Sequence, residues 1–343
     1  MADVPIMTTA AEKPIEQGPL EHGGDLEALR HRYPEAPRPW IDLSTGINPV
    51  PYSVGDLPAE VWSRLPSRAA EGALLAAAAR RYGVGGDAAI VAAPGTQALI
   101  QLLPRLRPRS KVAIVGRTYA EHEFCWRREG HAVCVATGLA ATDGADVVVI
   151  VNPDNPTGRL VPADALRAVK APLLVVDEAF IDLLPARASL AGGLPGNTVV
   201  LRSFGKTYGL AGVRLGFAIA SPDLAERLRG ALGPWAVSGP ALEIGRRALA
   251  DDSWLDATAR RLAADGEKLD TLLRAAGCTV LGGTTLFRLA EHGEVLRVAD
   301  ALARHGIHIR TFTDRPTLLR FGLPANDEEF ARLAGALQVP QNV

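Results

Sequence analysis

The stretch Arg202–Gly216, RSFGKTYGLAGVRLG, places a single lysine, Lys206, in a segment otherwise rich in glycine and apolar side chains. The preceding residues NTVVLRS and the following residues VRLGFAIA have the apolar content of buried strands. Lys206 is therefore predicted on a tight connection between two strands. Burial there would lower the pKa of its amine, and such lysines form Schiff bases with aldehydes. A surface lysine whose amine reaches solvent would fit the same stretch taken alone.

The composition is that of an ordinary soluble globular protein. The chain has 343 residues, of which 48% are apolar and 22% are charged, which is enough for a full core and more than one lobe. A net charge of −1 gives no indication of a nucleic-acid partner. Cys125, Cys134 and Cys278 are odd in number and form no CxxC pair, so neither disulfides nor a metal site is expected.

Nothing in the sequence indicates export or membrane insertion. The first residues, MADVPIMTTAAEKPIEQGPLE, lack a basic region followed by a long apolar run. No later stretch reaches the roughly 18 apolar residues that a spanning helix needs. A cytoplasmic location is expected.

Short apolar runs alternate with helical patterns through the first two thirds of the chain. The runs are AAIVAA, KVAIVG, HAVCVA, DVVVIVNP, PLLVVDEA, TVVLRS and RLGFAIA, and RAAEGALLAAAARRYG is typical of a helix that ends at Gly83. This alternation predicts a mostly parallel sheet with helices on both faces and ligands at the carboxyl ends of its strands. After Pro222 a run of helices precedes four short strands, which indicates a second, smaller α+β lobe.

Three places along this sheet are candidates for a site. Asp177 ends the apolar run PLLVVDEA, where a buried carboxylate needs a positive partner or a donor, in a ligand site or in a structural ion pair. The segment NPDNPTG, residues 152–158, follows another strand and could be only a turn. The segment APGTQALIQLL begins a helix, and the N–H groups of Gly95, Thr96 and Gln97 could bind a phosphate.

Together the motifs NPDNPTG, VVDEAF and SFGKTYGLAGVRLG resemble the fold-type I pyridoxal-phosphate (PLP) aminotransferases. The resemblance runs from about His22 to the carboxyl terminus, in the branch of the histidinol-phosphate aminotransferases and threonine-phosphate decarboxylases. It implies an N-terminal segment (1–44) that contributes to the substrate site, a large PLP-binding domain (45–221) and a small α+β domain (222–343). It also implies a homodimer.

The resemblance assigns a role to each candidate. Lys206 would bind the PLP aldehyde and then transfer protons, and Asp177 would pair with the ring nitrogen. Asn155 would donate to the ring 3′-oxygen, and Tyr119 in GRTYAEHEF would stack on the ring. Arg320 in LLRFGLP would bind the substrate carboxylate. The residues expected around the PLP phosphate are Gly95, Thr96, Gln97, Ser203 and Arg214.

Two positions depart from the usual pattern of the family. Phe180 stands where aminotransferases carry the tyrosine of Asp-Glu-Ala-Tyr, so one hydrogen bond to the ring 3′-oxygen is missing. Near Leu65 and Pro66 many relatives have a tyrosine that reaches the cofactor phosphate of a second subunit, and this chain has none. A dimer has less direct support here, although it is still expected.

The choice of reaction depends on the amino-terminal stretch EHGGDLEAL, residues 21–29, ahead of IDLSTGINPVPY. This pairing resembles the threonine-phosphate decarboxylases of cobalamin biosynthesis. It implies that the substrate phosphate is bound by His22, Gly23, Gly24 and Asn48, with Arg310 as a further charge.

The expected reaction is decarboxylation of L-threonine O-3-phosphate to (R)-1-amino-2-propanol O-2-phosphate. Orientation of the substrate on the cofactor decides which bond breaks, and sequence does not reveal it. Histidinol-phosphate aminotransferase therefore stays an alternative. A non-catalytic PLP-binding regulator is another, although such proteins usually carry basic DNA-binding helices.

Overall fold

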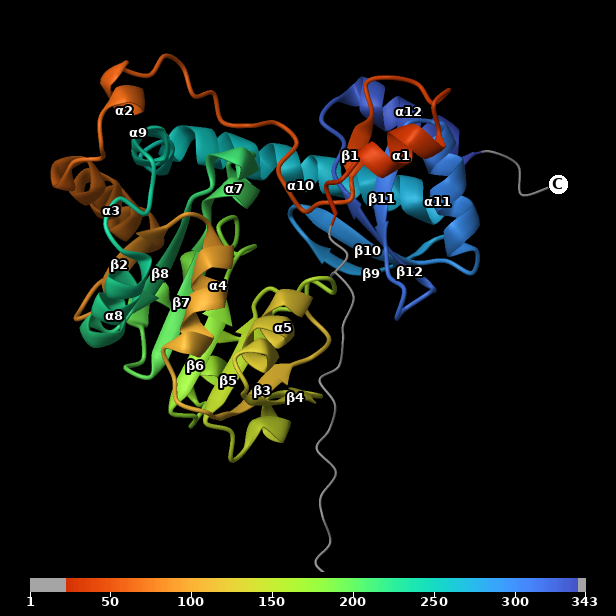
Figure 1. The fold of residues 1–343 in the computed structure, drawn as a ribbon. Helices are drawn as coiled ribbons and strands as arrows, with labels where there is room; N and C mark the ends of the chain where they lie inside the picture. Colours follow the sequence, from red (N-terminus) through yellow and green to blue (C-terminus); the bar gives the residue numbers. More distant parts are fainter. Residues whose placement is uncertain (1–22, 339–343) are drawn as a thin grey trace, which may run out of the picture.

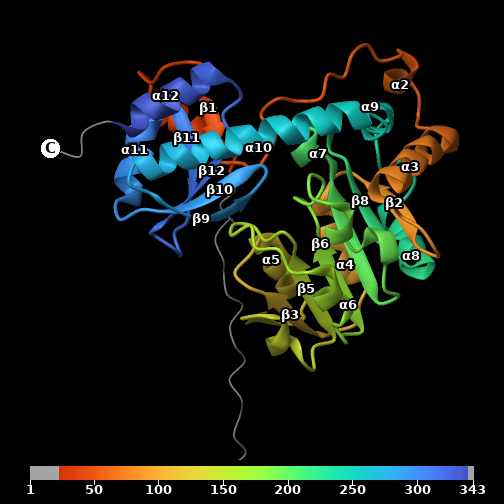
Figure 2. The ribbon, with the colours of Figure 1, turned by 180° about the vertical axis from the view of Figure 1, so that it is seen from behind.

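Two lobes, each built on its own β-sheet, make up the protein (Figure 1). The computed structural model describes residues 23–338. The 24-residue helix α10 (Asp252–Ala275) lies along both lobes in Figure 1 and in the opposite view of Figure 2. This single long helix therefore links the two halves of the molecule.

The seven strands of the large lobe follow the order β2-β8-β7-β6-β5-β3-β4. They are β2 (Ala89–Ala93), β3 (Lys111–Val115), β4 (Ala132–Ala136), β5 (Val147–Val151), β6 (Leu173–Asp177), β7 (Thr198–Ser203) and β8 (Gly216–Ala220). The pairs from β7 to β4 are parallel, and β8 runs antiparallel to both β2 and β7. The predicted mostly parallel sheet is thus present, and the carboxyl ends of β5, β6 and β7 lie side by side.

Helices cover both faces of this sheet. Residues of α4 (Thr96–Arg105), α5 (Ala120–Arg128) and α8 (Pro222–Leu232) share a core with one face. Residues of α3 (Arg68–Tyr82), α6 (Ala163–Arg167) and α9 (Gly239–Leu249) share a core with the other. Local sequence sets the ends of α3 as predicted, because Ser67 Oγ accepts from Ala70 N and Gly83 closes the helix with a φ of 64°.

The small lobe contains a five-stranded sheet of order β1-β11-β12-β10-β9. Its strands are β1 (Ile41–Leu43), β9 (Thr279–Thr284), β10 (Phe287–Glu291), β11 (Ile307–Thr311) and β12 (Leu318–Gly322). Its helices are α1 (Glu27–Arg32), α11 (Val295–Arg304) and α12 (Asp327–Leu337), and the short helices α2 (Glu60–Ser63) and α7 (Phe204–Thr207) lie on the large-lobe side.

Both predicted domain boundaries, near residues 44 and 222, need correction. Helices α8 and α9 lie after the predicted boundary at residue 221 but pack on the large lobe, where Leu228 and Leu242 belong to its two cores. Strand β1 lies before residue 45 but pairs in parallel with β11, through Ile41 opposite Ile307, and so completes the small sheet. Apolar faces pack against elements that are distant in the sequence, so the change of sequence pattern at Pro222 does not mark the boundary between the lobes.

Within residues 23–338, no helix combines the length and the apolar character that crossing a membrane requires. The same residues contain no group of three or more His, Cys, Asp or Glu side chains placed to hold a metal ion.

Candidate active site

A cavity of about 160 Å³ opens at the carboxyl ends of β5, β6 and β7. Every residue predicted to bind PLP lines it, although these residues come from five separate stretches of the chain. They are Gly95, Thr96, Gln97, Tyr119, Asn155, Asp177, Ser203, Lys206 and Arg214. We call this space the cofactor cavity.

One end of the cofactor cavity is built to bind an anion. Helix α4 begins after Gly95 with no side-chain cap, so the N–H groups of its first turn have no side-chain acceptor. Gly95 has a φ of 82°, and a Cβ there would lie 2.8 Å from Arg214 Nη2. Glycine is therefore favoured by the backbone conformation, and its lack of a Cβ leaves room for the guanidinium to lie this close. Amide donors, the helix dipole and an arginine together suit a phosphate group.

Asp177 lies deep in the cofactor cavity at the end of β6 and is 3% exposed. Its Oδ1 accepts from Ala179 N at 3.1 Å, and its Oδ2 lies 2.9 Å from His122 Nε2 in a hydrogen bond. His122, on α5, is 1% exposed. The sequence analysis missed this histidine, although its place three residues after Tyr119, within one helical turn, could have marked it as facing the same site.

Lys206 lies on α7, with its side chain in both the cofactor cavity and the neighbouring one. Burial, together with the positive charges of Arg320 and Arg214, lowers the pKa of its amine to about 8, while Asp177 opposes the shift. Its Nζ lies 5.7 Å from the ring centre of Phe180. A buried amine with a pKa this low has a sizeable neutral fraction slightly above neutral pH, which suits it to attack an aldehyde.

Tyr119 is held in place by a chain of polar contacts. Its hydroxyl donates to Gln97 Oε1 at 3.2 Å, and Gln97 Nε2 donates to Glu121 Oε2 at 2.6 Å. Burial raises the pKa of the Tyr119 phenol, so this group stays protonated. The ring is therefore fixed at the wall of the cofactor cavity.

A second cavity, of about 870 Å³, lies between the lobes and shares Tyr119, Asn155, Phe180 and Lys206 with the first. We call it the outer cavity. Its small-lobe wall includes Arg310 and Arg320.

These two arginines are directly opposite each other on the antiparallel strands β11 and β12. Like charges at such positions repel, so the pair indicates a place for negatively charged groups.

Arg320 is 8% exposed and already oriented by acceptors. Its Nη1 donates to Asn155 Oδ1, and its Nη2 donates to Ser44 O at 2.6 Å. Burial and the neighbouring Arg310 lower its pKa to about 10, which leaves it charged at neutral pH. Asn155 thus joins the two cavities, because it lines both and accepts from Arg320.

The amino-terminal residues predicted to bind substrate differ in where they lie relative to the outer cavity. Gly23 lines the outer cavity, and a Cβ on it would lie 2.5 Å from Ser44 O. Gly24 N donates to Ser44 Oγ at 2.8 Å, so this glycine packs beside the cavity wall. His22 lies outside the described residues.

Asn48 corrects the prediction. It lines neither cavity, and it is 2% exposed. Its Nδ2 donates to Thr207 O at 2.9 Å, and its Oδ1 accepts from Arg261 Nη2 at 2.6 Å and from Val50 N. Both ends of the amide are used to join α7 to α10, so its role here is structural.

Phe180 closes the wall between the two cavities, where the usual family pattern has tyrosine. Its ring meets that of Phe287 edge to face, with centres 5.1 Å apart. A Cβ on Gly46 would lie 2.8 Å from Phe180 and 2.9 Å from Phe287, so glycine gives these rings their space.

The family model for aminotransferase class I and II matches residues 62–337. The chain belongs to this aminotransferase family. It is 41% identical over 328 residues to a threonine-phosphate decarboxylase of Pseudomonas aeruginosa, covering 93% of this chain and 97% of that protein. It is 43% identical over 329 residues to a threonine-phosphate decarboxylase of a Sinorhizobium species, covering 93% and 98%. The resemblance predicted from the motifs is confirmed.

Among solved structures, the histidinol-phosphate aminotransferase of Sinorhizobium meliloti in complex with pyridoxal-5'-phosphate is similar with a TM-score of 0.75. The match covers 97% of this chain and 98% of that chain at 23% sequence identity. This likeness confirms the predicted fold, the fold type I of the aminotransferase family.

Proposed function

We propose that this protein uses PLP to decarboxylate L-threonine O-3-phosphate to (R)-1-amino-2-propanol O-2-phosphate, a step of cobalamin biosynthesis. The observation that carries the proposal is the pairing of Arg310 with Arg320 beside the cofactor cavity. The substrate has a carboxylate and a phosphate, and two arginines on one wall match two anions. The two relatives that align over nearly their whole length have the same activity in their names.

The residues of the cofactor cavity fit PLP at each of its polar groups. The uncapped start of α4, Ser203 and Arg214 suit its phosphate, and the buried Asp177 suits its ring nitrogen. Asn155 is placed to donate to the ring oxygen, because its Oδ1 is engaged by Arg320 and its amide nitrogen is left as the donor. When bound, PLP supplies an electron-accepting ring conjugated to the substrate Cα.

The remaining chemistry belongs to the side chains of this protein. Lys206, with a pKa of about 8, can donate a proton near neutral pH, as the carbon that loses CO2 requires. The Asp177 carboxylate would pair with the ring nitrogen of bound PLP and so favour the protonated ring. Arg320 orients the carboxylate and Arg310 the phosphate, so together they set which bond at Cα breaks.

We further propose that the protein is a cytoplasmic homodimer. Trp62, Leu65 and Trp235 are 68%, 67% and 59% exposed, which is unusual for large apolar side chains on a free surface. They lie on or next to α2 and before α9, and these two helices contact each other. All three cysteines are unpaired, which suits a reducing compartment.

The deciding experiment incubates purified protein and PLP with L-threonine O-3-phosphate and measures CO2, the amino-alcohol phosphate and any 2-oxo acid. Production of CO2 with the amino-alcohol phosphate supports the proposal. A 2-oxo acid that appears only with an amino-group acceptor indicates a transaminase. PLP binding without either product indicates a regulator.

The substrate specificity has its own control. L-Threonine lacks the phosphate, so its kcat/KM should be lower by roughly 100-fold or more if two charge-assisted contacts are lost. The variant Arg310→Gln should reduce this preference for the phosphorylated substrate. An unchanged ratio would mean that Arg310 does not contact the phosphate.

A further inference from the structure

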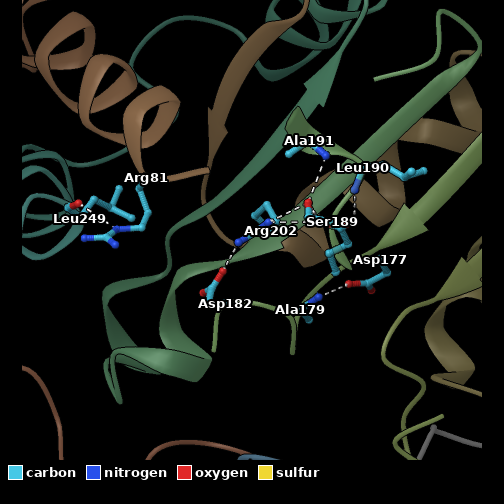
Figure 3. A network of polar contacts seen from close by, with 10 residues as sticks. Arg81, Asp177, Ala179, Asp182, Ser189, Leu190, Ala191, Arg202 and Leu249 are labelled. Atoms are coloured by element: carbon cyan, nitrogen blue, oxygen red, sulfur yellow. Dashed lines mark hydrogen bonds and ion pairs between the residues drawn. The ribbon is translucent and has the colours of Figure 1, made fainter. Parts of the chain in front are cut away.

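Behind the cofactor cavity lies a buried group of charges centred on Arg202, near the end of β7. Its Nη1 donates to Glu178 Oε2 at 3.1 Å and to Ser189 Oγ at 3.2 Å, and its Nη2 donates to Asp182 Oδ1 (Figure 3). The guanidinium carbon lies 4.2 Å from the ring centre of Tyr82. We call Arg202, Glu178, Asp182 and Ser189 the Arg202 cluster. Its hydrogen bonds and the ring contact together fix the plane of the guanidinium.

The ionic side chains of the Arg202 cluster are almost inaccessible to solvent. The side chains of Arg202, Glu178 and Asp182 are 6%, 0% and 5% exposed. Well-packed apolar residues in place of a buried ion pair are often as stable or more so, because ions lose their hydration on burial. Stability alone therefore does not explain these three charges. The planar fork of an arginine adds direction, since it holds two carboxylates at set angles.

The cluster lies on the face of the sheet opposite to the cofactor cavity. Val176 and Val200 belong to the core on the α3 side, and side chains alternate along a strand. Glu178 and Arg202, two residues further on, therefore lie on that same side. Their chain neighbours Asp177 and Ser203 line the cofactor cavity.

The two carboxylates of the cluster flank a short segment that forms part of the cavity wall. Ala179 and Phe180, between Glu178 and Asp182, both line the cofactor cavity. Ala179 N is the donor that orients Asp177 Oδ1, at 3.1 Å (Figure 3). The donor to Asp177 thus lies on the backbone between the two carboxylate partners of Arg202.

The far side of Glu178 is held just as firmly. Its Oε1 accepts from Leu190 N at 2.9 Å, and its Oε2 accepts from Ser189 Oγ at 2.6 Å. Its backbone N donates to Leu201 O at 2.9 Å, which continues the pairing of β6 with β7. The position of Glu178 is therefore fixed at one end of the segment Ala179–Phe180. At the other end, Asp182 connects the segment to Arg202 by its hydrogen bond.

We propose that Arg202 is a positioning residue of the cofactor site: it fixes the segment Ala179–Phe180 and thereby the orientation of the Asp177 carboxylate toward the cofactor ring. This inference rests on the proposed function only in taking Asp177 as the partner of the ring nitrogen. Loss of Arg202 leaves Asp177 and its contact with His122 in place but loosens the Ala179 N–H that orients Oδ1.

The test compares Arg202→Met and Asp182→Asn with the wild-type holoenzyme. Asp182→Asn keeps the side-chain volume and leaves one cation with one carboxylate, so no unbalanced charge is buried and the fold is retained. The matched control is Arg288→Met, which breaks the partly buried Arg288–Asp270 ion pair in the small lobe. Neither residue of that pair lines the cofactor cavity or the outer cavity.

Three quantities are measured for each variant: the pH midpoint of the absorbance change of bound PLP without substrate, kcat with threonine phosphate, and the urea midpoint. Arg202→Met should displace the pH midpoint and lower kcat about 10- to 100-fold, since misplacement of a reacting group by 1 Å can cost that much. Asp182→Asn should change both in the same direction by less. Arg288→Met should lower only the urea midpoint.

A wild-type pH midpoint and kcat in both cluster variants would overturn the inference, whatever their urea midpoints. If Arg202→Met does not fold, Asp182→Asn decides by the same criterion. The absorbance reading uses PLP alone, so it tests the role of Arg202 even if threonine phosphate proves not to be the substrate. Absence of decarboxylation in the wild type would refute only the proposed function.

Discussion

Replacement of Gly216 by alanine should displace the anion-binding end of the cofactor cavity. Gly216 begins β8, and a Cβ on it would lie 2.5 Å from Thr96 N and 2.9 Å from Gly95 C. Both of these are backbone atoms, so no change of rotamer can relieve the contact. Because ordinary contact begins near 3.4 Å, the start of α4 and the start of β8 must separate by about 0.9 Å (3.4 − 2.5).

The cost of this movement appears in two measurable quantities. Overpacking of a tight site costs roughly 1–3 kcal/mol. If the cofactor-free protein cannot relax, the whole cost lowers its free energy of unfolding. If it relaxes by moving α4 away, the same cost appears as weaker PLP binding. At 1.4 kcal/mol for each factor of ten, the Kd for PLP would rise by about 5- to 150-fold. The two losses together should come to roughly 1–3 kcal/mol.

The assay is urea unfolding of cofactor-free protein together with titration of that protein with PLP. Gly72→Ala is the matched control, because Gly72 lies within α3 and a Cβ there meets nothing within 4 Å. This control should be stabilised by about 0.5–1 kcal/mol and should bind PLP as the wild type does. Wild-type stability and PLP affinity in Gly216→Ala would refute the close packing of β8 against the start of α4.

Three further results are expected. Borohydride reduction of the holoenzyme should leave PLP attached to Lys206, and a reduced adduct mapped to Lys111 or Lys170 would exclude this assignment. The free energy of unfolding of the cofactor-free protein should rise by roughly 3 kcal/mol at most as the pH rises from about 8 to 10. In this range Lys206 in the unfolded chain, with a pKa of 10.5, still holds the proton that Lys206 in the folded protein has lost. Urea unfolding of Lys206→Met should lack this gain. Asp177→Asn should lower kcat by roughly 100-fold or more while PLP stays bound, because the protonated ring nitrogen of PLP loses its buried negative partner. Near-normal turnover of this variant would mean that Asp177 has a structural role.

Much of the cofactor site could be predicted from the sequence, because its residues follow strands and begin helices. The end of an apolar run marks Asp177, and a glycine before a helical pattern marks Gly95. Such signals depend on backbone conformation within a few residues, and parallel strands bring their carboxyl ends to one edge. The nine residues named from separate motifs therefore line one cavity.

Other features depend on which surfaces pack together, and local pattern carries little of that information. The approach of His122 to Asp177 requires α5 to cover the end of β6. The pairing of β1 with β11 joins residues more than 260 positions apart, and it corrects the predicted boundary at residue 44. The amide of Asn48, predicted to bind substrate, is instead used to join α7 to α10.

The sequence by itself determined the strands, the helix ends and the chemical groups available at the cofactor site, because propensity, capping and apolar periodicity act over one or two turns of chain. Tertiary structure alone decided that Arg310 faces Arg320 and that Arg202 lies between Glu178 and Asp182. Each of these arrangements places charged side chains close together where solvent has little access or where packing is tight. Such placement is stable only when the surrounding packing fixes every partner at once, and that packing exists only in the folded chain.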